Sequence, residues 1–252
     1  MFEATFRFIR EQFGDQEFIP LHEPCFGCNE KAYLIDCIDS TFVSSVGAYV
    51  GKFEQAVAEF VGSRYAIAVV NGTQGLFVTL KALDIDHSCE VLTQSLTFVA
   101  TANAIHYTGA APIFIDVERS TLSLSPAALK DFLQQHTEMC NGKRINKMSG
   151  RTIAACLPMH NCGHPAQITE LQQICQENNI TLVEDAAESL GSFFNEKHTG
   201  TFGKVGVFSF NGNKVVTTGG GGMLVTDDET LANSLRHLTT TAKVAHNWEF
   251  IH

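Results

Sequence analysis

Apolar residues along this chain follow two periods, one typical of short buried strands and one typical of amphipathic helices. The strand-like runs lie at residues 65–70, 90–92, 112–115, 152–156, 180–183 and 223–226, with one more that begins at residue 205. The stretches with helical spacing lie at residues 54–60, 71–83, 97–107, 125–135, 168–178 and 228–239. In the first of these helices Phe53, Val57 and Phe60 share a face, and Gly62 ends it.

Strands that alternate with helices predict an α/β fold of three layers, in which a mostly parallel sheet carries helices on both faces. We expect a short amphipathic helix and lead-in over residues 1–20 and one large domain over residues 21–252. The polar, weakly patterned stretch 138–150 is expected to be a surface excursion. Active sites of such sheets lie beyond the carboxyl ends of the strands, so the residues that follow each strand are the candidates for chemistry.

Composition narrows the class of protein without naming a reaction. The chain has 252 residues, of which 44% are hydrophobic and 17% charged, as in soluble globular proteins. The net charge of −10 argues against a nucleic-acid partner. Neither a signal peptide nor a run of about 18 uncharged apolar residues occurs, which argues against a membrane segment and predicts a cytoplasmic protein.

The eight cysteines do not form a metal-binding pattern. Only Cys25 and Cys28 have ligand-like spacing, and a zinc site needs a second pair of ligands at a suitable distance. We therefore expect reduced thiols and no metal ion.

The most informative residue is Lys214, which lies between the apolar run from Val205 and the turn Gly219–Gly222. An amine held among apolar groups loses its charge more readily, and the neutral amine is a nucleophile. The alternative is a surface lysine whose charged end reaches water. Upstream, Asp185 ends another apolar strand, where a carboxylate must find a partner or become neutral. Its structural alternative is a helix N-cap.

A lysine together with a carboxylate at a strand end is the pair that pyridoxal phosphate requires, one for a Schiff base and one for the ring nitrogen. Gly72, Thr73 and Gln74 lie where a strand meets a helix, and their N–H groups could hold a phosphate. An ordinary capped helix is the alternative there. Ser209 could add a phosphate donor, and Phe98 could lie on the face of a flat ring or simply pack in the core.

In combination these features resemble the DegT/StrS-type nucleotide-sugar aminotransferases, a branch of the fold-type I pyridoxal phosphate enzymes. The resemblance covers nearly the whole chain. The motifs that carry it are Asn71-Gly-Thr73, Thr97-Phe-Val-Ala-Thr-Ala-Asn103, Gly163-His-Pro165, Glu184-Asp-Ala-Ala-Glu188 and Ser209-Phe-Asn-Gly-Asn-Lys214. Three other segments resemble the aminotransferases of legionaminic acid and related bacterial surface-sugar pathways, namely residues 18–24, 39–47 and 237–243.

The resemblance implies a homodimer that transfers an amino group from glutamate to C4 of a UDP-4-keto-6-deoxy-N-acetylhexosamine. Lys214 would bind the cofactor covalently and move the proton, and Asp185 would keep the pyridine nitrogen protonated. The ring would stack on Phe98 and lie near Glu188. The phosphate would be held by residues of two strand ends, namely Gly72, Thr73, Gln74 and Ser209. Related dehydratases carry histidine at the position of Lys214, so the lysine favours transamination.

Two features depart from the family pattern. The turn after the lysine reads Gly219-Gly-Gly-Gly222, where the family usually has a glutamate in second place. The family also continues for roughly a third more chain, with a small C-terminal domain, whereas residues 247–252 resemble an interrupted domain. The alternative to a working enzyme is therefore a catalytically silent fragment that keeps the cofactor-binding core. A plain nucleotide-binding module fits less well, because no Gly-x-Gly-x-x-Gly or Walker-type loop follows a strand.

Overall fold

A computed structural model describes residues 2–45 and 47–240 of the chain. Its principal sheet contains nine strands. Seven of them follow the order β1-β11-β10-β7-β6-β2-β3, and the β4–β5 hairpin is attached to β6. The strands of this sheet are β1 (Tyr65–Val69), β2 (Cys89–Gln94), β3 (Ala111–Ile115), β4 (Thr137–Cys140), β5 (Lys143–Asn146), β6 (Thr152–Leu157), β7 (Thr181–Asp185), β10 (Val205–Ser209) and β11 (Gly222–Thr226). From β10 to β3 every neighbouring pair is parallel, while β11 runs antiparallel to both β1 and β10.

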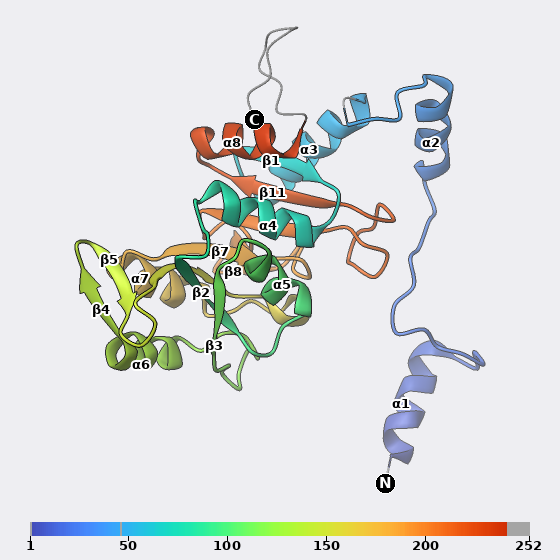
Figure 1. Cartoon of the computed structure of the whole chain (residues 1–252). Coiled ribbons are helices and arrows are strands. Elements are labelled where there is room, and N and C mark those ends of the chain that lie inside the picture. Colours follow the sequence, from blue (N-terminus) through green and yellow to red (C-terminus); the bar gives the residue numbers. More distant parts are fainter. Residues whose placement is uncertain (1, 46, 241–252) are drawn as a thin grey trace, which may run out of the picture.

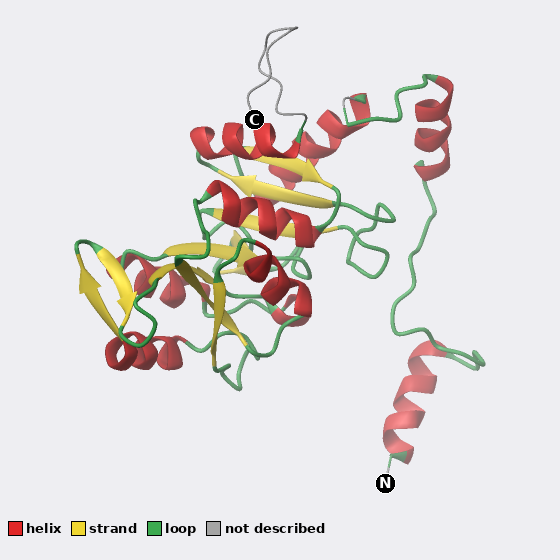
Figure 2. Ribbon diagram, viewed as in Figure 1, coloured by secondary structure: helices red, strands yellow, loops and turns green. Residues whose placement is uncertain are grey.

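Helices cover both faces of the sheet (Figures 1 and 2). One face packs against α4 (Gly72–Ala82), α5 (Val99–Tyr107) and α8 (Glu229–Thr239). The other face packs against α3 (Ala48–Val61), α6 (Pro126–His136) and α7 (Ile168–Glu177). The predicted three-layer α/β fold with a mostly parallel sheet is therefore confirmed.

The core divides according to the alternation of side chains along the strands. On β11, Leu224 packs toward α4 and α8, while its neighbours Met223 and Val225 pack toward α3. A strand that is buried on both faces needs apolar residues at every position, which explains the unbroken apolar runs in the sequence.

The N-terminal part stands apart from this body (Figure 1). Helix α1 (Glu3–Phe13) has no buried residue, and an extended segment leads from it to α2 (Glu30–Asp39). Helix α2 contacts α3 through the rings of Tyr33 and Tyr49, whose centroids lie 5.2 Å apart, and the Tyr49 hydroxyl donates to Asp36 at 3.0 Å. The domain boundary expected after residue 20 stays a prediction.

The structure adds to or corrects the sequence analysis in three places. The stretch 138–150 lies at the surface, as expected, and it also holds most of the β4–β5 hairpin, whose short, largely exposed strands leave no apolar alternation. Phe60 is not part of the core: it is 59% exposed, and its ring lies edge-on to that of His198 with the centroids 5.7 Å apart. The sequence reading also missed α2 and the small hairpin of β8 (Phe193–Phe194) and β9 (Lys197–His198).

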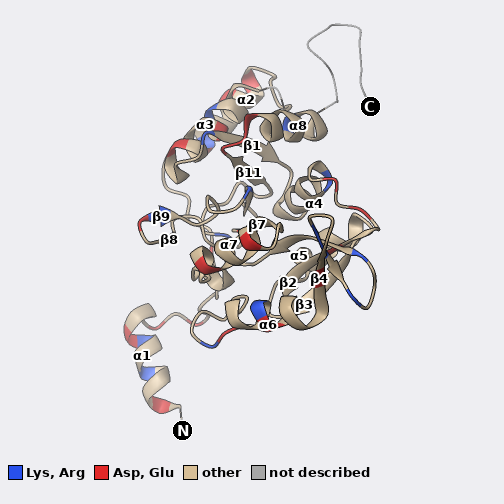
Figure 3. Ribbon diagram, turned by 90° about the vertical axis from the view of Figure 1, so that its left-hand side faces the viewer, with Lys and Arg blue, Asp and Glu red and all other residues tan. Residues whose placement is uncertain are grey.

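Positions of Lys and Arg and positions of Asp and Glu are interspersed along the ribbon of the body (Figure 3). In the part of the chain that the structure describes, no helix is long and apolar enough to cross a membrane. The predicted interruption at residues 247–252 lies outside the described residues.

The packing of β10 predicts the effect of one substitution. A methyl group on Gly206 would overlap the carbonyl oxygen of Gly200, so Gly206→Ala must displace backbone. We expect a loss of about 1–3 kcal/mol in the free energy of unfolding, measured by urea denaturation.

Gly51→Ala in α3 is the matched control, because nothing lies within 4 Å of the added methyl group. It should stabilise the chain by about 0.5–1 kcal/mol, since alanine loses less backbone entropy in a helix. Equal stability of Gly206→Ala and the unchanged chain would contradict the described packing.

Candidate active site

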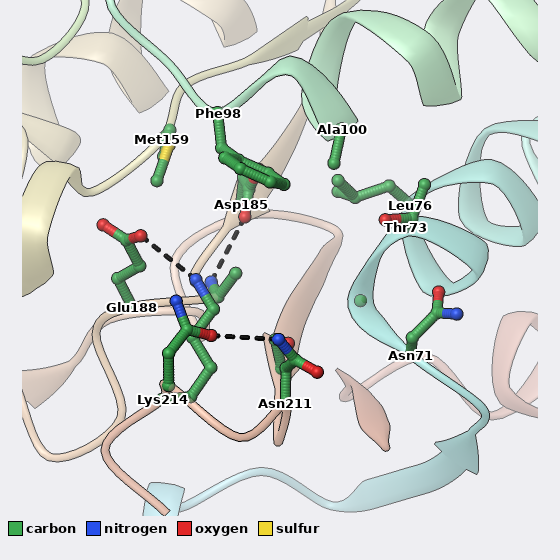
Figure 4. A pocket seen from close by; sticks show the side chains of 14 residues that line it. Asn71, Thr73, Leu76, Phe98, Ala100, Met159, Asp185, Glu188, Asn211 and Lys214 are labelled. Carbon is green, nitrogen blue, oxygen red and sulfur yellow. Dashed lines mark hydrogen bonds and ion pairs between the residues drawn. The ribbon is translucent and has the colours of Figure 1, made fainter. Parts of the chain in front are cut away.

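The carboxyl ends of β1, β6, β7 and β10 and the loop after β2 meet at one edge of the sheet and enclose a cavity of about 310 Å³. The residues that line it are Asn71, Gly72, Thr73, Leu76, Phe98, Ala100, Met159, Asp185, Ala187, Glu188, Ser209, Asn211, Asn213 and Lys214. Figure 4 shows Phe98 over Asp185 on one side and the Lys214–Glu188 pair on the other. All predicted site residues except Gln74 line this cavity.

Lys214 lies in the loop after β10, and its surroundings are more polar than the sequence indicated. Its Nζ donates to Oε1 of Glu188 at 3.0 Å, and only 12% of its side chain is exposed. Its ammonium group lies 5.9 Å from the centroid of the Phe98 ring. The expected apolar surround is therefore wrong: an ion pair, made by a carboxylate from the segment after β7, holds the amine in the cavity.

The loop of Lys214 also contacts the N-terminal arm. The ring nitrogen Nε2 of His22 lies 3.1 Å from the carbonyl oxygen of Lys214. This contact joins residues 192 positions apart and places the segment before α2 against the loop that carries Lys214.

Glu188 is held from two sides. Its Oε1 accepts from Lys214, while its Oε2 accepts from the backbone N–H of Cys162 at 2.9 Å. Cys162 lies in the short 3₁₀ turn Asn161–Gly163. Gly163 has a φ of +79°, and a methyl group there would lie 2.7 Å from the Glu188 carbonyl oxygen. Only glycine fits this approach, which gives a physical role to one residue of the Gly163-His-Pro165 motif.

Asp185 is the last residue of β7, and only 3% of it is exposed. Its Oδ2 accepts from the Thr101 hydroxyl at 2.7 Å, and its Oδ1 accepts from the backbone N–H of Ala187 at 3.2 Å. Burial raises the pKa of Asp185, although these hydrogen bonds and the nearby Lys214 and His160 act in the opposite direction. The site thus holds an acid whose ionised form has too little compensation from the protein alone.

The neighbouring carboxylate, Glu184, points to the opposite side of β7 and has a different environment. It accepts from the N–H groups of Gly200, Phe202 and Gly203 at 2.6–2.7 Å. It also lies 3.0 Å from Nε2 of His160. Because Nδ1 of His160 accepts from the Ala166 N–H, the ring proton lies on Nε2 and points to Glu184. This carboxylate is fully satisfied, fixes the loop at residues 200–203, and lies outside the cavity.

The far end of the cavity is built from the start of α4 and the end of β10. The first N–H groups of a helix have no acceptor within it, so those of Gly72 and Thr73 are suited to an anion. A methyl group on Gly72 would come within 3.1 Å of Cβ of Ser209, so glycine lets the two elements meet.

Gln74 does not take the role expected for it. Its backbone N–H donates to the Asn71 side chain at 2.8 Å, which caps α4, and Gln74 lines a different cavity beside Arg236. The capped-helix alternative therefore holds for this one residue.

Sequence reasoning missed several residues of the site. Met159 follows β6 and pairs with Asp185 across the parallel bridge Met159↔Asp185. Asn211 donates to Asn213 at 3.0 Å in the loop that carries Lys214. The asparagines stand inside a quoted motif and could have been found, whereas nothing near Met159 in the sequence points to a site. Among the described residues no group of three or more His, Cys, Asp or Glu could hold a metal ion.

Comparison with known proteins identifies the family to which this chain belongs. A family model described as the DegT/DnrJ/EryC1/StrS aminotransferase family matches residues 24–251. GDP-perosamine synthase of Escherichia coli O157:H7 is 37% identical over 230 residues, which are 91% of this chain and 59% of that protein. EpsN of Bacillus subtilis (strain 168), whose name describes a pyridoxal phosphate-dependent aminotransferase, is 38% identical over 225 residues, covering 89% of this chain and 55% of EpsN.

A solved structure gives the same result for the fold. The aminotransferase from Psychrobacter cryohalolentis superposes with a TM-score of 0.79 at 29% identity, over 90% of this chain and 54% of that one. The chain thus spans little more than half the length of the proteins it matches.

The buried acid predicts how stability depends on pH. Because burial raises the pKa of Asp185 above its ordinary value of 3.8, the folded chain holds this proton more tightly than the unfolded chain. Stability should therefore fall as pH rises from the ordinary value through the raised one. Asp185→Asn should remove this fall and stabilise the empty chain near neutral pH by about 1–3 kcal/mol. Urea denaturation between about pH 4 and about pH 8 measures it.

Asp228→Asn is a control of opposite sign. Hydrogen bonding from Lys204 lowers the pKa of Asp228, so its contribution to stability is present above the ordinary value and lost as pH falls. A change of the same sign in both variants would refute the account of Asp185.

Proposed function

Because the chain belongs to the DegT/DnrJ/EryC1/StrS aminotransferase family, we propose that it forms the cofactor-binding and amino-transferring part of a pyridoxal phosphate-dependent sugar aminotransferase. The substrate proposed is a UDP-4-keto-6-deoxy-N-acetylhexosamine, aminated at C4 with glutamate as the amino donor. The observation that carries the proposal is the cavity in which Lys214, Asp185 and the start of α4 converge.

The residues of the cavity fit the cofactor in four respects. Lys214 supplies a primary amine, and Asp185 is a buried carboxyl group that a cationic ring nitrogen would stabilise in its ionised form. Phe98 offers an aromatic face at the cavity. The Gly72 and Thr73 N–H groups with the Ser209 hydroxyl form a donor set for a phosphate, assisted by the dipole of α4.

Pyridoxal phosphate supplies an electron sink for the carbanion that forms when a proton leaves the carbon bearing nitrogen. The protein residues bind, orient and move protons around it. Asp185 keeps a proton on the ring nitrogen, and its two hydrogen bonds fix the position of its oxygens. Lys214 would carry a proton between the substrate carbon and the cofactor carbon at its Nζ.

Glu188 has two roles in this proposal. While the amine of Lys214 is free, Glu188 holds it as an ion pair 3.0 Å away, facing the cavity. The Cys162 N–H keeps the carboxylate in place when the lysine leaves it. The amine therefore returns to one position after each transfer.

The nucleotide of the substrate is the least constrained part of the proposal. The motifs resemble enzymes that act on UDP-sugars, whereas one relative at 37% identity is named for a GDP-sugar product. We retain the UDP-sugar and make the nucleotide an outcome of the experiment.

A homodimer is proposed as the working form. Helix α1 has no buried residue and exposes Phe6, Phe8 and Phe13, and α2 exposes Leu34 and Ile38. Such apolar side chains on an arm call for a covering surface. We place the protein in the cytoplasm, where its eight free thiols stay reduced.

Cofactor binding is measured by absorbance after pyridoxal phosphate is added. We expect the visible band of a lysine-bound cofactor, its loss in Lys214→Ala, and its retention in Lys204→Ala, an exposed lysine paired with Asp228. Glutamate should then convert the cofactor to its amine form, at a rate that Lys214→Ala lowers by about 100- to 10,000-fold.

The same samples separate the alternatives. No band in the unchanged chain would refute the proposal, and a band that glutamate never converts would support the silent fragment. Light scattering should give twice the mass of one chain, and a mass of one chain would refute the homodimer.

The sugar is identified by mass spectrometry after incubation with glutamate and matched UDP- and GDP-linked 4-keto sugars. We expect amination of the UDP-linked N-acetyl sugar. Amination of the GDP-linked sugar alone would overturn the nucleotide assignment and leave the aminotransferase reaction intact.

A further inference from the structure

The motif from Thr97 to Thr101 contains more than the aromatic ring of Phe98. Thr101 lies on α5, is fully buried, and donates from its hydroxyl to Oδ2 of Asp185 at 2.7 Å. The hydroxyl of Thr97, which precedes α5, lies 2.8 Å from that of Thr101. The two threonines therefore continue the hydrogen bonding of Asp185 away from the cavity.

The sulfur of Met159 ends this row of polar atoms. Its Sδ lies 3.1 Å from the Thr97 hydroxyl, and Met159 is 2% exposed. The backbone bridge between β6 and β7 places Met159 beside Asp185, so the row begins and ends on adjacent strand ends. A thioether sulfur accepts a hydrogen bond but cannot donate one.

Counting hydrogens shows that the row has two complete arrangements. Each threonine hydroxyl has one hydrogen to donate. When Asp185 is ionised it only accepts, so Thr101 donates to Asp185 and Thr97 donates to Thr101. When Asp185 is neutral it donates to Thr101, Thr101 donates to Thr97, and Thr97 donates to the sulfur of Met159.

We propose that Thr97, Thr101 and Met159 form a reversible hydrogen-bond relay that satisfies Asp185 in both its ionised and its neutral state. The change between the arrangements needs only rotation of the two hydroxyl hydrogens. No proton leaves either threonine, and the one proton that is gained or lost belongs to Asp185. In both arrangements Oδ1 of Asp185 keeps its bond from the Ala187 N–H.

The relay resolves a conflict within the site, and it rests on the cofactor role proposed for Asp185. Burial raises the pKa of Asp185 and so makes its neutral form easier to reach, since burial outweighs the opposing effects of its hydrogen bonds, of Lys214 after β10 and of His160 after β6. Opposite a cationic ring nitrogen it must be ionised. A fixed donor would serve one of these states and leave the other with an unsatisfied buried group, whereas the two hydroxyls serve both.

The relay assigns opposite effects to its two ends. Thr101→Val removes the partner of both forms, but the hydrogen bond to the ionised carboxylate is charge-assisted and therefore the stronger one, so the neutral form should gain. Met159→Leu removes the last acceptor of the neutral arrangement, so the ionised form should gain. A merely structural role for either residue would not move the two variants in opposite directions.

The experiment measures the pKa of Asp185 itself, in the full chain without cofactor, from the pH dependence of its carboxyl ¹³C chemical shift. Asp185→Asn identifies the signal by its absence. We expect Thr101→Val to raise the pKa by about one pH unit or more, Thr101→Ser to restore it, and Met159→Leu to lower it.

Thr93→Val is the matched control, because Thr93 is also fully buried but donates to the Leu157 carbonyl oxygen at 2.8 Å. It should lower stability and leave the pKa of Asp185 unchanged. An unchanged pKa in Thr101→Val, or shifts of the same sign in Thr101→Val and Met159→Leu, would overturn the relay. Since no cofactor or substrate is present, these results are independent of whether the chain transfers amino groups.

Discussion

Two consecutive buried carboxylates at the end of β7 constrain much of this structure. Glu184 and Asp185 lie on opposite sides of the strand, and both are almost wholly removed from water. Removing a charge from water costs several kcal/mol unless hydrogen bonds or an opposite charge replace the lost hydration. The surrounding loops are arranged around how each carboxylate meets this requirement.

The two carboxylates have different partners, and this gives Glu184 a structural role and Asp185 a chemical one. Three backbone N–H groups and His160 satisfy Glu184, which thereby fixes the loop before β10 and has no capacity left for a ligand. Asp185 receives two hydrogen bonds and keeps a raised pKa, so it gains most from a cation placed opposite it. Glu184 therefore anchors a loop, and Asp185 is the functional acid. They face opposite sides because successive side chains of a strand alternate between its two faces.

The rest of the site follows from the parallel sheet. Because β6, β7 and β10 run in the same direction, Met159, Asp185 and the loop of Lys214 emerge at one edge. Close contacts at glycines then bring the loops together, as where Gly163 meets the backbone of Glu188. Glu188 in turn holds the amine at a set position, 3.0 Å from one of its carboxylate oxygens.

The sequence determined the layers of this fold and most members of its site. Its unbroken apolar runs predict strands buried on both faces, and Lys214, Asp185, Gly72 and Ser209 each follow or end such a run, which places them at the same edge. It could not predict the short exposed β4–β5 hairpin, whose pairing depends on backbone contacts that leave no pattern of side chains.

Only the tertiary structure decided which partners these residues have. The pairing of Lys214 with Glu188 and the hydroxyl row from Asp185 to Met159 join residues from separate elements. Periodicity reports which face of an element is buried. The hydrogen bonds of a site depend on distances of about 3 Å between elements, and these exist only once the elements have packed.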